Sequence, residues 1–168
     1  MSAEVGPSVM LVEDFGPAWQ PGRFELGTDG PRAILAGVDG SRTAMRAAAF
    51  AAGLARRQAS RLVVVYVASP SVWAALSPAP AGEAVQQVID SIAAEVRSSI
   101  QERSEELGVP IRFLVRAGDP FDGIKRSAAE VQADMVVVGA SESAGHRLIG
   151  SLASRLVRSG LWPVTVVP

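Results

Sequence analysis

Residues 33–41 read AILAGVDGS. The first six of them form an apolar run with the length of a buried strand. The run ends at Asp39-Gly40-Ser41, a turn sequence in which the Ser41 side chain can cap a following helix. Residues 42–58 are rich in alanine at helical spacing, so a helix there can lie close against a sheet. This stretch therefore predicts a strand, a tight turn and a helix that covers the sheet.

The same alternation repeats to the end of the chain. Further strands are expected at 62–67, 111–115, 135–138 and 164–167, and further helices at 83–107, 120–131 and 151–159. Strands that alternate with helices form a mainly parallel sheet, and wholly apolar strands are covered on both faces. We therefore predict an α/β fold with a doubly wound, mainly five-stranded parallel sheet. It is Rossmann-like or flavodoxin-like, with strand order 3-2-1-4-5 and helices on both faces.

The N-terminal segment, residues 1–31, differs from the rest because glycine or proline interrupts it every few residues. We expect no regular element to run through it. Two interpretations stay open: a flexible tail, or an arm whose Val9 to Val12, Phe15 and Trp19 dock on a neighbouring surface. The chain is thus divided into an N-terminal extension, 1–31, and one domain, 32–168.

The composition argues against several classes of function. Sixteen basic and seventeen acidic residues give a net charge of −1, which provides no basic field for nucleic acid. Cysteine is absent and histidine occurs once, so neither a thiolate nor a histidine-rich metal site is expected. No signal sequence or membrane-length apolar run is visible. We expect a soluble, cytoplasmic protein with no nucleic-acid or membrane partner, and we assign no metal-binding residue.

Ligands of such sheets bind outside the carboxyl ends of the strands. One loop expected there, residues 139–151, reads GASESAGHRLIGS. Its glycines let the backbone approach a ligand, and Gly150-Ser151 begins a helix whose amides and dipole favour an anion. His146 and Arg147 either add positive charge to this site or lie in solvent.

Four segments of residues 32–168, in order, resemble the universal stress protein family. They are ILAGVDGS at 34–41, GDP at 118–120, DMVVVG at 134–139 and WPVTVV at 162–167. They are similar to the family's opening strand and turn, its third-strand signature, its fourth strand and its closing strand. The resemblance implies a stress-response binding or regulatory domain.

The resemblance also implies where ATP or another adenine nucleotide would bind. Nucleotide-binding members carry G-x2-G-x9-G-[ST], whose amides and last hydroxyl hold phosphates. By resemblance, Asp39 and Val67 take the positions that contact the adenosine moiety, although Asp39 also suits a turn and cap. Gly139, Gly150 and Ser151 match the motif and face the phosphates.

The middle of the loop departs from that motif. Glu142 stands where the second glycine is expected, and Gly139 and Gly150 are eleven residues apart where the motif requires thirteen. A carboxylate repels a polyphosphate, and a shorter loop has less backbone to surround it. Gly145, His146 and Arg147 would then form a different cradle.

Three functions stay open from the sequence. The chain is a nucleotide-binding regulatory protein, a dimeric interaction module that binds no nucleotide, or a slow nucleotide hydrolase. No nucleophile with a paired base is visible, and the single lysine, Lys125, lies in a predicted helix rather than in a P-loop. We therefore expect no enzyme and assign no catalytic residue. The strand Val164 to Val167 is expected at an exposed sheet edge, and the resemblance implies a homodimer formed there.

Overall fold

The computed structural model describes residues 8–18, 31–69, 82–141 and 150–168. Its strands are β1 (Ser8–Phe15), β2 (Ala33–Val38), β3 (Arg61–Ala68), β4 (Ile111–Ala117), β5 (Met135–Gly139) and β6 (Val164–Val167). Its helices are α1 (Arg42–Arg57), α3 (Gly82–Leu107), α4 (Pro120–Glu130) and α5 (Ser151–Ser159). No helix within these ranges is long and apolar enough to cross a membrane.

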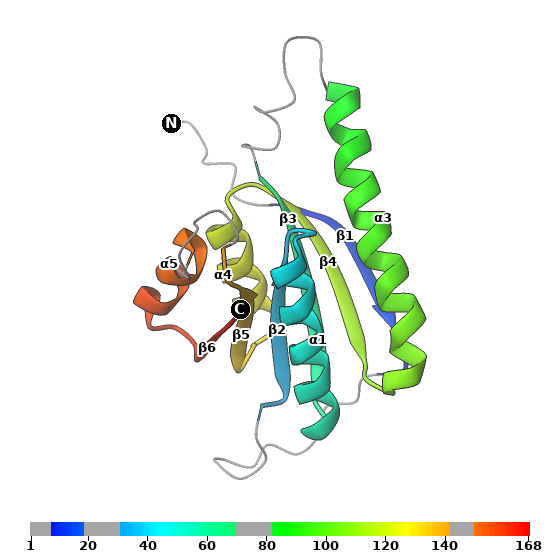
Figure 1. The fold of residues 1–168 in the computed structure, drawn as a ribbon, viewed down its shortest axis with the longest axis vertical. Coiled ribbons are helices and arrows are strands. Elements are labelled where there is room, and N and C mark those ends of the chain that lie inside the picture. The colour runs from blue at the N-terminus through cyan, green and yellow to red at the C-terminus, as the bar shows by residue number, and fades with distance from the viewer. Residues whose placement is uncertain (1–7, 19–30, 70–81, 142–149) are drawn as a thin grey trace.

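The strands form one sheet in the order β1-β4-β3-β2-β5-β6 (Figure 1). The strands β4, β3, β2, β5 and β6 run parallel to one another, and β1 pairs with β4 in antiparallel orientation. Counted along the chain without β1, the parallel strands follow the order 3-2-1-4-5, so the predicted doubly wound α/β fold is confirmed.

Helices cover both faces of the sheet. Alternate residues of β2 point to opposite sides: Ile34 packs with residues of α1 and α3, while Leu35 packs with residues of α4 and α5. All six residues of β2 are buried. This explains why the strand shows no polar alternation in sequence.

The predicted helix caps are present. The Ala44 amide donates a hydrogen bond to the Ser41 hydroxyl (3.2 Å) at the start of α1. The Asp122 amide donates to Asp119 (3.1 Å) at the start of α4, where Pro120 takes the first helical position.

The sequence missed β1. The expectation that no regular element runs through residues 1–31 is wrong for residues 8–15, which form this strand along the edge of β4. Side chains of Leu11 and Phe15 pack against the core beneath α3. Residues 8–15 therefore form a docked arm rather than a flexible tail. Trp19, the other residue expected to dock, lies outside the described residues.

Two ion pairs hold β1 in place. Arg97 of α3 donates to Glu13, and Arg112 of β4 donates two hydrogen bonds to Asp14 (2.7 and 3.0 Å). The Arg112 hydrogen bond is the main reason that the pKa of Asp14 is lowered, and burial acts in the opposite direction.

The strand β4 runs past its predicted end at Val115. Arg116 is almost fully buried and donates to Ser127 of α4 (2.6 Å) and to Glu130. The charged side chain is tolerated inside because each of these partners satisfies part of its donor set. It therefore ties β4 to α4.

Candidate functional site

The carboxyl ends of the parallel strands meet at one edge of the sheet. Gly37 pairs with Val65 on one side and with Val138 on the other. From this level β2 and β5 each run one residue further, to Val38 and Gly139, and β3 runs three residues further, to Ala68. Adjacent strands lie about 4.8 Å apart. The structure thus brings Asp39, Val67 and Gly139 together at this carboxyl-end edge.

Asp39 follows β2 directly and is exposed. Its Oδ1 accepts a hydrogen bond from the Ser41 amide (2.9 Å), and Gly40 supplies the positive φ of +84° that closes the turn. Its Oδ2 accepts no hydrogen bond within the described part of the chain. Asp39 therefore shapes the turn with one oxygen and leaves the other open to a ligand.

The charge of Asp39 also acts on the sheet beneath it. Tyr66, the only tyrosine, is buried at 2% exposure near the end of β3. Burial raises the pKa of Tyr66, and the negative charge of Asp39 raises it further. The hydroxyl therefore stays protonated at neutral pH.

Val67 is half-buried and packs against α4. A Cβ added to Gly123 of that helix would lie 2.7 Å from Cγ2 of Val67. Gly123 therefore lets α4 approach β3 closely, and this contact fixes the Val67 side chain. Gly123 was not predicted from the sequence, since a glycine inside a helix gives no signal of which strand lies against it.

Gly139 is fixed by packing. A Cβ at this position would lie 2.6 Å from the backbone nitrogen of Ala44 and 2.6 Å from the carbonyl carbon of Thr43. No side chain fits between β5 and the first turn of α1. The motif's first glycine is thus explained by the meeting of strand and helix, before any ligand is considered.

The residues at the two ends of the loop after β5, Ser141 and Gly150, lie in contact with each other. A Cβ on Gly150 would lie 2.9 Å from Cβ of Ser141. Gly150 is the N-cap of α5 and accepts from the Ser154 amide (2.9 Å), but it has no side chain with which to cap the helix. Ser151 begins the helix and is exposed. The first turn of α5 therefore presents amides and the positive end of its dipole at this edge.

Four residues singled out in the loop, Glu142, Gly145, His146 and Arg147, lie outside the described residues. The cradle predicted from the last three stays a prediction.

Another contact at this edge was missed by the sequence analysis. Arg155 of α5 donates to Asp119, the N-cap of α4 (3.1 Å), and its guanidinium lies 4.4 Å from the ring centroid of Phe121. Burial favours the protonated form of Asp119, but the bonds from Arg155 and Asp122 outweigh it, so the pKa of Asp119 is lowered. This pair holds α5, and with it Gly150 and Ser151, against α4.

The described ranges contain no group of three or more side chains able to hold a metal ion. At one edge of the sheet they place the Oδ2 oxygen of Asp39, two glycines without side chains (Gly139 and Gly150) and the uncapped N-terminus of α5. These groups suit binding of a ligand with both hydrogen-bond donors and an anionic part.

An open, mainly parallel sheet with a candidate binding site at the carboxyl ends of its strands defines the broad class of doubly wound α/β proteins. Within it, a sequence model described as the universal stress protein family matches residues 31–168. The chain belongs to the universal stress protein family.

Individual relatives agree. A universal stress protein of Methanocaldococcus jannaschii is 27% identical over 136 residues, which covers 80% of each chain. The crystal structure of a family protein from Burkholderia pseudomallei is 27% identical, with a TM-score of 0.60 over 82% of this chain and 96% of that one. A universal stress protein in complex with cAMP is 25% identical, with a TM-score of 0.59 over 82% of this chain and 96% of that one.

Proposed function

We propose that this protein binds an adenine nucleotide at the carboxyl-end edge and that binding regulates its interactions with partner proteins. The observation that carries the proposal is that the open Oδ2 of Asp39 and the uncapped N-terminus of α5 lie at the same edge of the sheet. The two are linked through Gly139, which touches the first turn of α1, and through Ser141, which touches Gly150. The similar protein in complex with cAMP supports this ligand class.

In this proposal each residue has a separate task. Asp39 accepts hydrogen bonds from the sugar or the base, and Val67 packs beside the base. The amides of Ser151 and the following turn, with the Ser151 hydroxyl, bind phosphate oxygens. The bound nucleotide alters the surface around the loop, which is where a partner would sense it.

The proposed function is binding in the cytoplasm rather than catalysis. Asp39 accepts a hydrogen bond from the amide of Ser41 in the turn. The described residues of this edge include no histidine or lysine that could act as its partner in acid–base chemistry. Phosphate release measured over hours should equal the rate without protein.

Calorimetric titration with ATP, AMP and cAMP tests the proposal. The wild type should show saturable binding to at least one of them, and Asp39→Asn should weaken it about tenfold or more. Asparagine keeps an acceptor for the Ser41 amide, so the turn survives while the charge is lost. Glu105→Gln, an exposed change on α3, is the matched control and should bind normally.

Glu142→Gly separates two forms of the hypothesis. If the wild type gives no heat up to millimolar nucleotide and Glu142→Gly gains binding, the natural protein is an interaction module whose pocket is closed to nucleotides. If neither binds, the nucleotide proposal is wrong.

The second candidate function is a homodimeric interaction module formed around β6. Within the described chain β6 pairs only with β5 and stands at the sheet edge. Val157 and Leu161, at the end of α5 and just before β6, are each more than half exposed. An unpaired strand edge with exposed apolar neighbours favours pairing with a second copy.

A further inference from the structure

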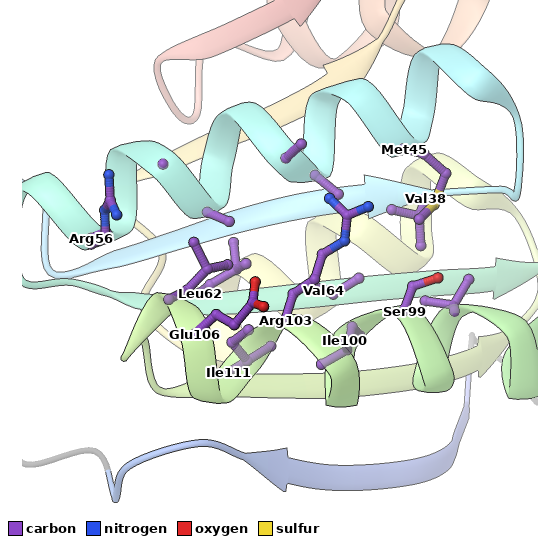
Figure 2. A pocket seen from close by; sticks show the side chains of 16 residues that line it. Val38, Met45, Arg56, Leu62, Val64, Ser99, Ile100, Arg103, Glu106 and Ile111 are labelled. Atoms are coloured by element: carbon purple, nitrogen blue, oxygen red, sulfur yellow. The ribbon is translucent and has the colours of Figure 1, made fainter.

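A cavity lies on one face of the sheet, between α1 and α3. It has a volume of about 320 Å³ and is floored by apolar residues of the sheet such as Val64 and Ile111 (Figure 2). The carboxyl-end residues Asp39, Gly139, Gly150 and Ser151 are not among the residues that line it. We call this cavity the α1–α3 groove.

The groove exists because α1 lines it with very small residues. They are Ala48, Ala49, Ala52 and Gly53. Facing side chains on α3, such as Val96 and Ile100, do not reach across the space that these residues leave. A concave, mainly apolar cavity of this volume lies at the small end of the range of small-molecule sites.

The charges at the groove opening are unbalanced. Arg56 of α1 and Arg103 of α3 line it, and neither has a hydrogen-bond or ion-pair partner in the structure as described. Arg56 and Met45 lie toward opposite ends of the groove, and Arg103 extends from α3 toward α1 so that its guanidinium lies between them (Figure 2). Glu106 adds one carboxylate, so the opening carries two positive charges and one negative.

We propose that the α1–α3 groove binds a medium-chain fatty carboxylate, with its alkyl tail on the alanine face and its head group at Arg103, whose side chain reaches across the groove (Figure 2). From Met45 to Arg56 helix α1 rises roughly 16 Å, which accepts an extended chain of about ten carbons. A guanidinium binds a carboxylate through two parallel hydrogen bonds.

A nucleotide fits less well. No aromatic side chain lines the groove, so a nucleotide base has nothing to stack on. The proposal does not depend on the nucleotide hypothesis, since the two sites share none of the residues assigned to ligands.

The test is calorimetric titration of the full chain with decanoate and with 1-decanol, both below their aggregation limits. Decanoate should bind more tightly than decanol. Arg103→Gln should weaken decanoate about tenfold and leave decanol unchanged. Glu106→Gln should strengthen decanoate, because it removes the one opposing charge.

A blocking variant and a control complete the set. Ala49→Phe fills the groove from an exposed position and should abolish binding of both ligands. Arg46→Gln, an exposed arginine of α1 that does not line the groove, should bind as the wild type does.

Three results would overturn the proposal. One is equal binding of decanoate and decanol that Ala49→Phe leaves unchanged, which indicates nonspecific adsorption. Another is decanoate binding that is lost in Asp39→Asn but kept in Arg103→Gln. The third is a wild-type dimer that Ala49→Phe dissociates, which makes the groove an interface between copies. Should Ala49→Phe fail to fold, Arg103→Gln and Glu106→Gln still decide, because both lie on the exposed face of α3.

Discussion

Gly139 at the end of β5 lies directly against Ala44 in the first turn of α1, where an added Cβ would stand 2.6 Å from the backbone nitrogen. The glycine that resembles a phosphate-loop residue is therefore first a packing residue. It fixes how closely the first helix meets the sheet, and hence where Asp39 stands relative to the loop after β5.

Gly139→Ala should accordingly lower the free energy of unfolding by about 1–3 kcal/mol without any nucleotide present, because the clash is with backbone. Urea denaturation followed by circular dichroism measures this. Gly53→Ala is the matched control. Its Cβ would meet only the end of the Arg57 side chain at 3.4 Å, and alanine inside a helix gains about 0.5–1 kcal/mol. Equal effects of the two changes would contradict this explanation of Gly139.

The pair between Asp14 and Arg112 should make the attachment of β1 depend on pH. The pKa of Asp14 is below its unfolded value of 3.8, so the pair stabilises the fold above about pH 4. That contribution is lost as the pH falls through the still lower folded value. Because both groups are partly exposed, Asp14→Asn should cost less than about 1 kcal/mol at pH 7.

The comparison of Asp14→Asn with the wild type at pH 7 and at pH 3 checks this. The difference in free energy of unfolding should shrink toward zero at the lower pH. A difference that stays constant would show that the ion pair does not hold β1.

Arg155→Ala should loosen α5 rather than unfold the protein. The change removes an exposed ion pair with Asp119 and a cation–π contact with Phe121, together worth about 1–2 kcal/mol. Hydrogen exchange should therefore speed up in residues 151–159 more than in β2 or β3. Arg158→Ala, in the same helix, is the control, and an equal effect of both would argue against this anchoring.

If the dimer forms around β6, Val157→Glu combined with Leu161→Glu should shift the protein to monomer in sedimentation analysis. Both side chains are exposed in the single chain, so folding should survive. Phe50→Glu, at another exposed apolar residue, on α1, should leave the dimer intact. Dissociation by Phe50→Glu alone would move the interface to the α1 side.

Much of the fold could be predicted because its signals are local. The apolar run at 33–38, the caps at Ser41 and Asp119, and the alternation of strands with helices each follow from neighbouring residues. The strand 8–15 was not predicted because glycine and proline recur throughout residues 1–31. The eight residues between Gly6-Pro7 and Gly16-Pro17 contain neither, which leaves room for one short strand. Its pairing with β4 spans about a hundred residues of chain and leaves no local pattern.

The candidate site was predictable only in outline. The rule that ligands bind at carboxyl ends located Asp39 and Gly139 correctly at one edge. The contacts of Gly123 with Val67 and of Arg155 with Asp119 depend on how α4 and α5 pack against the sheet and against each other. The spacing of residues in the sequence does not determine that packing.

The most direct test of the nucleotide site is a titration with ATP followed by amide shifts in ¹H–¹⁵N spectra. If the nucleotide binds at the carboxyl-end edge, the largest shifts should cluster at Asp39 to Ser41, at Gly139 to Ser141 and at Gly150 to Ala153. Shifts confined to the α1–α3 groove, or none at millimolar ATP, would contradict it.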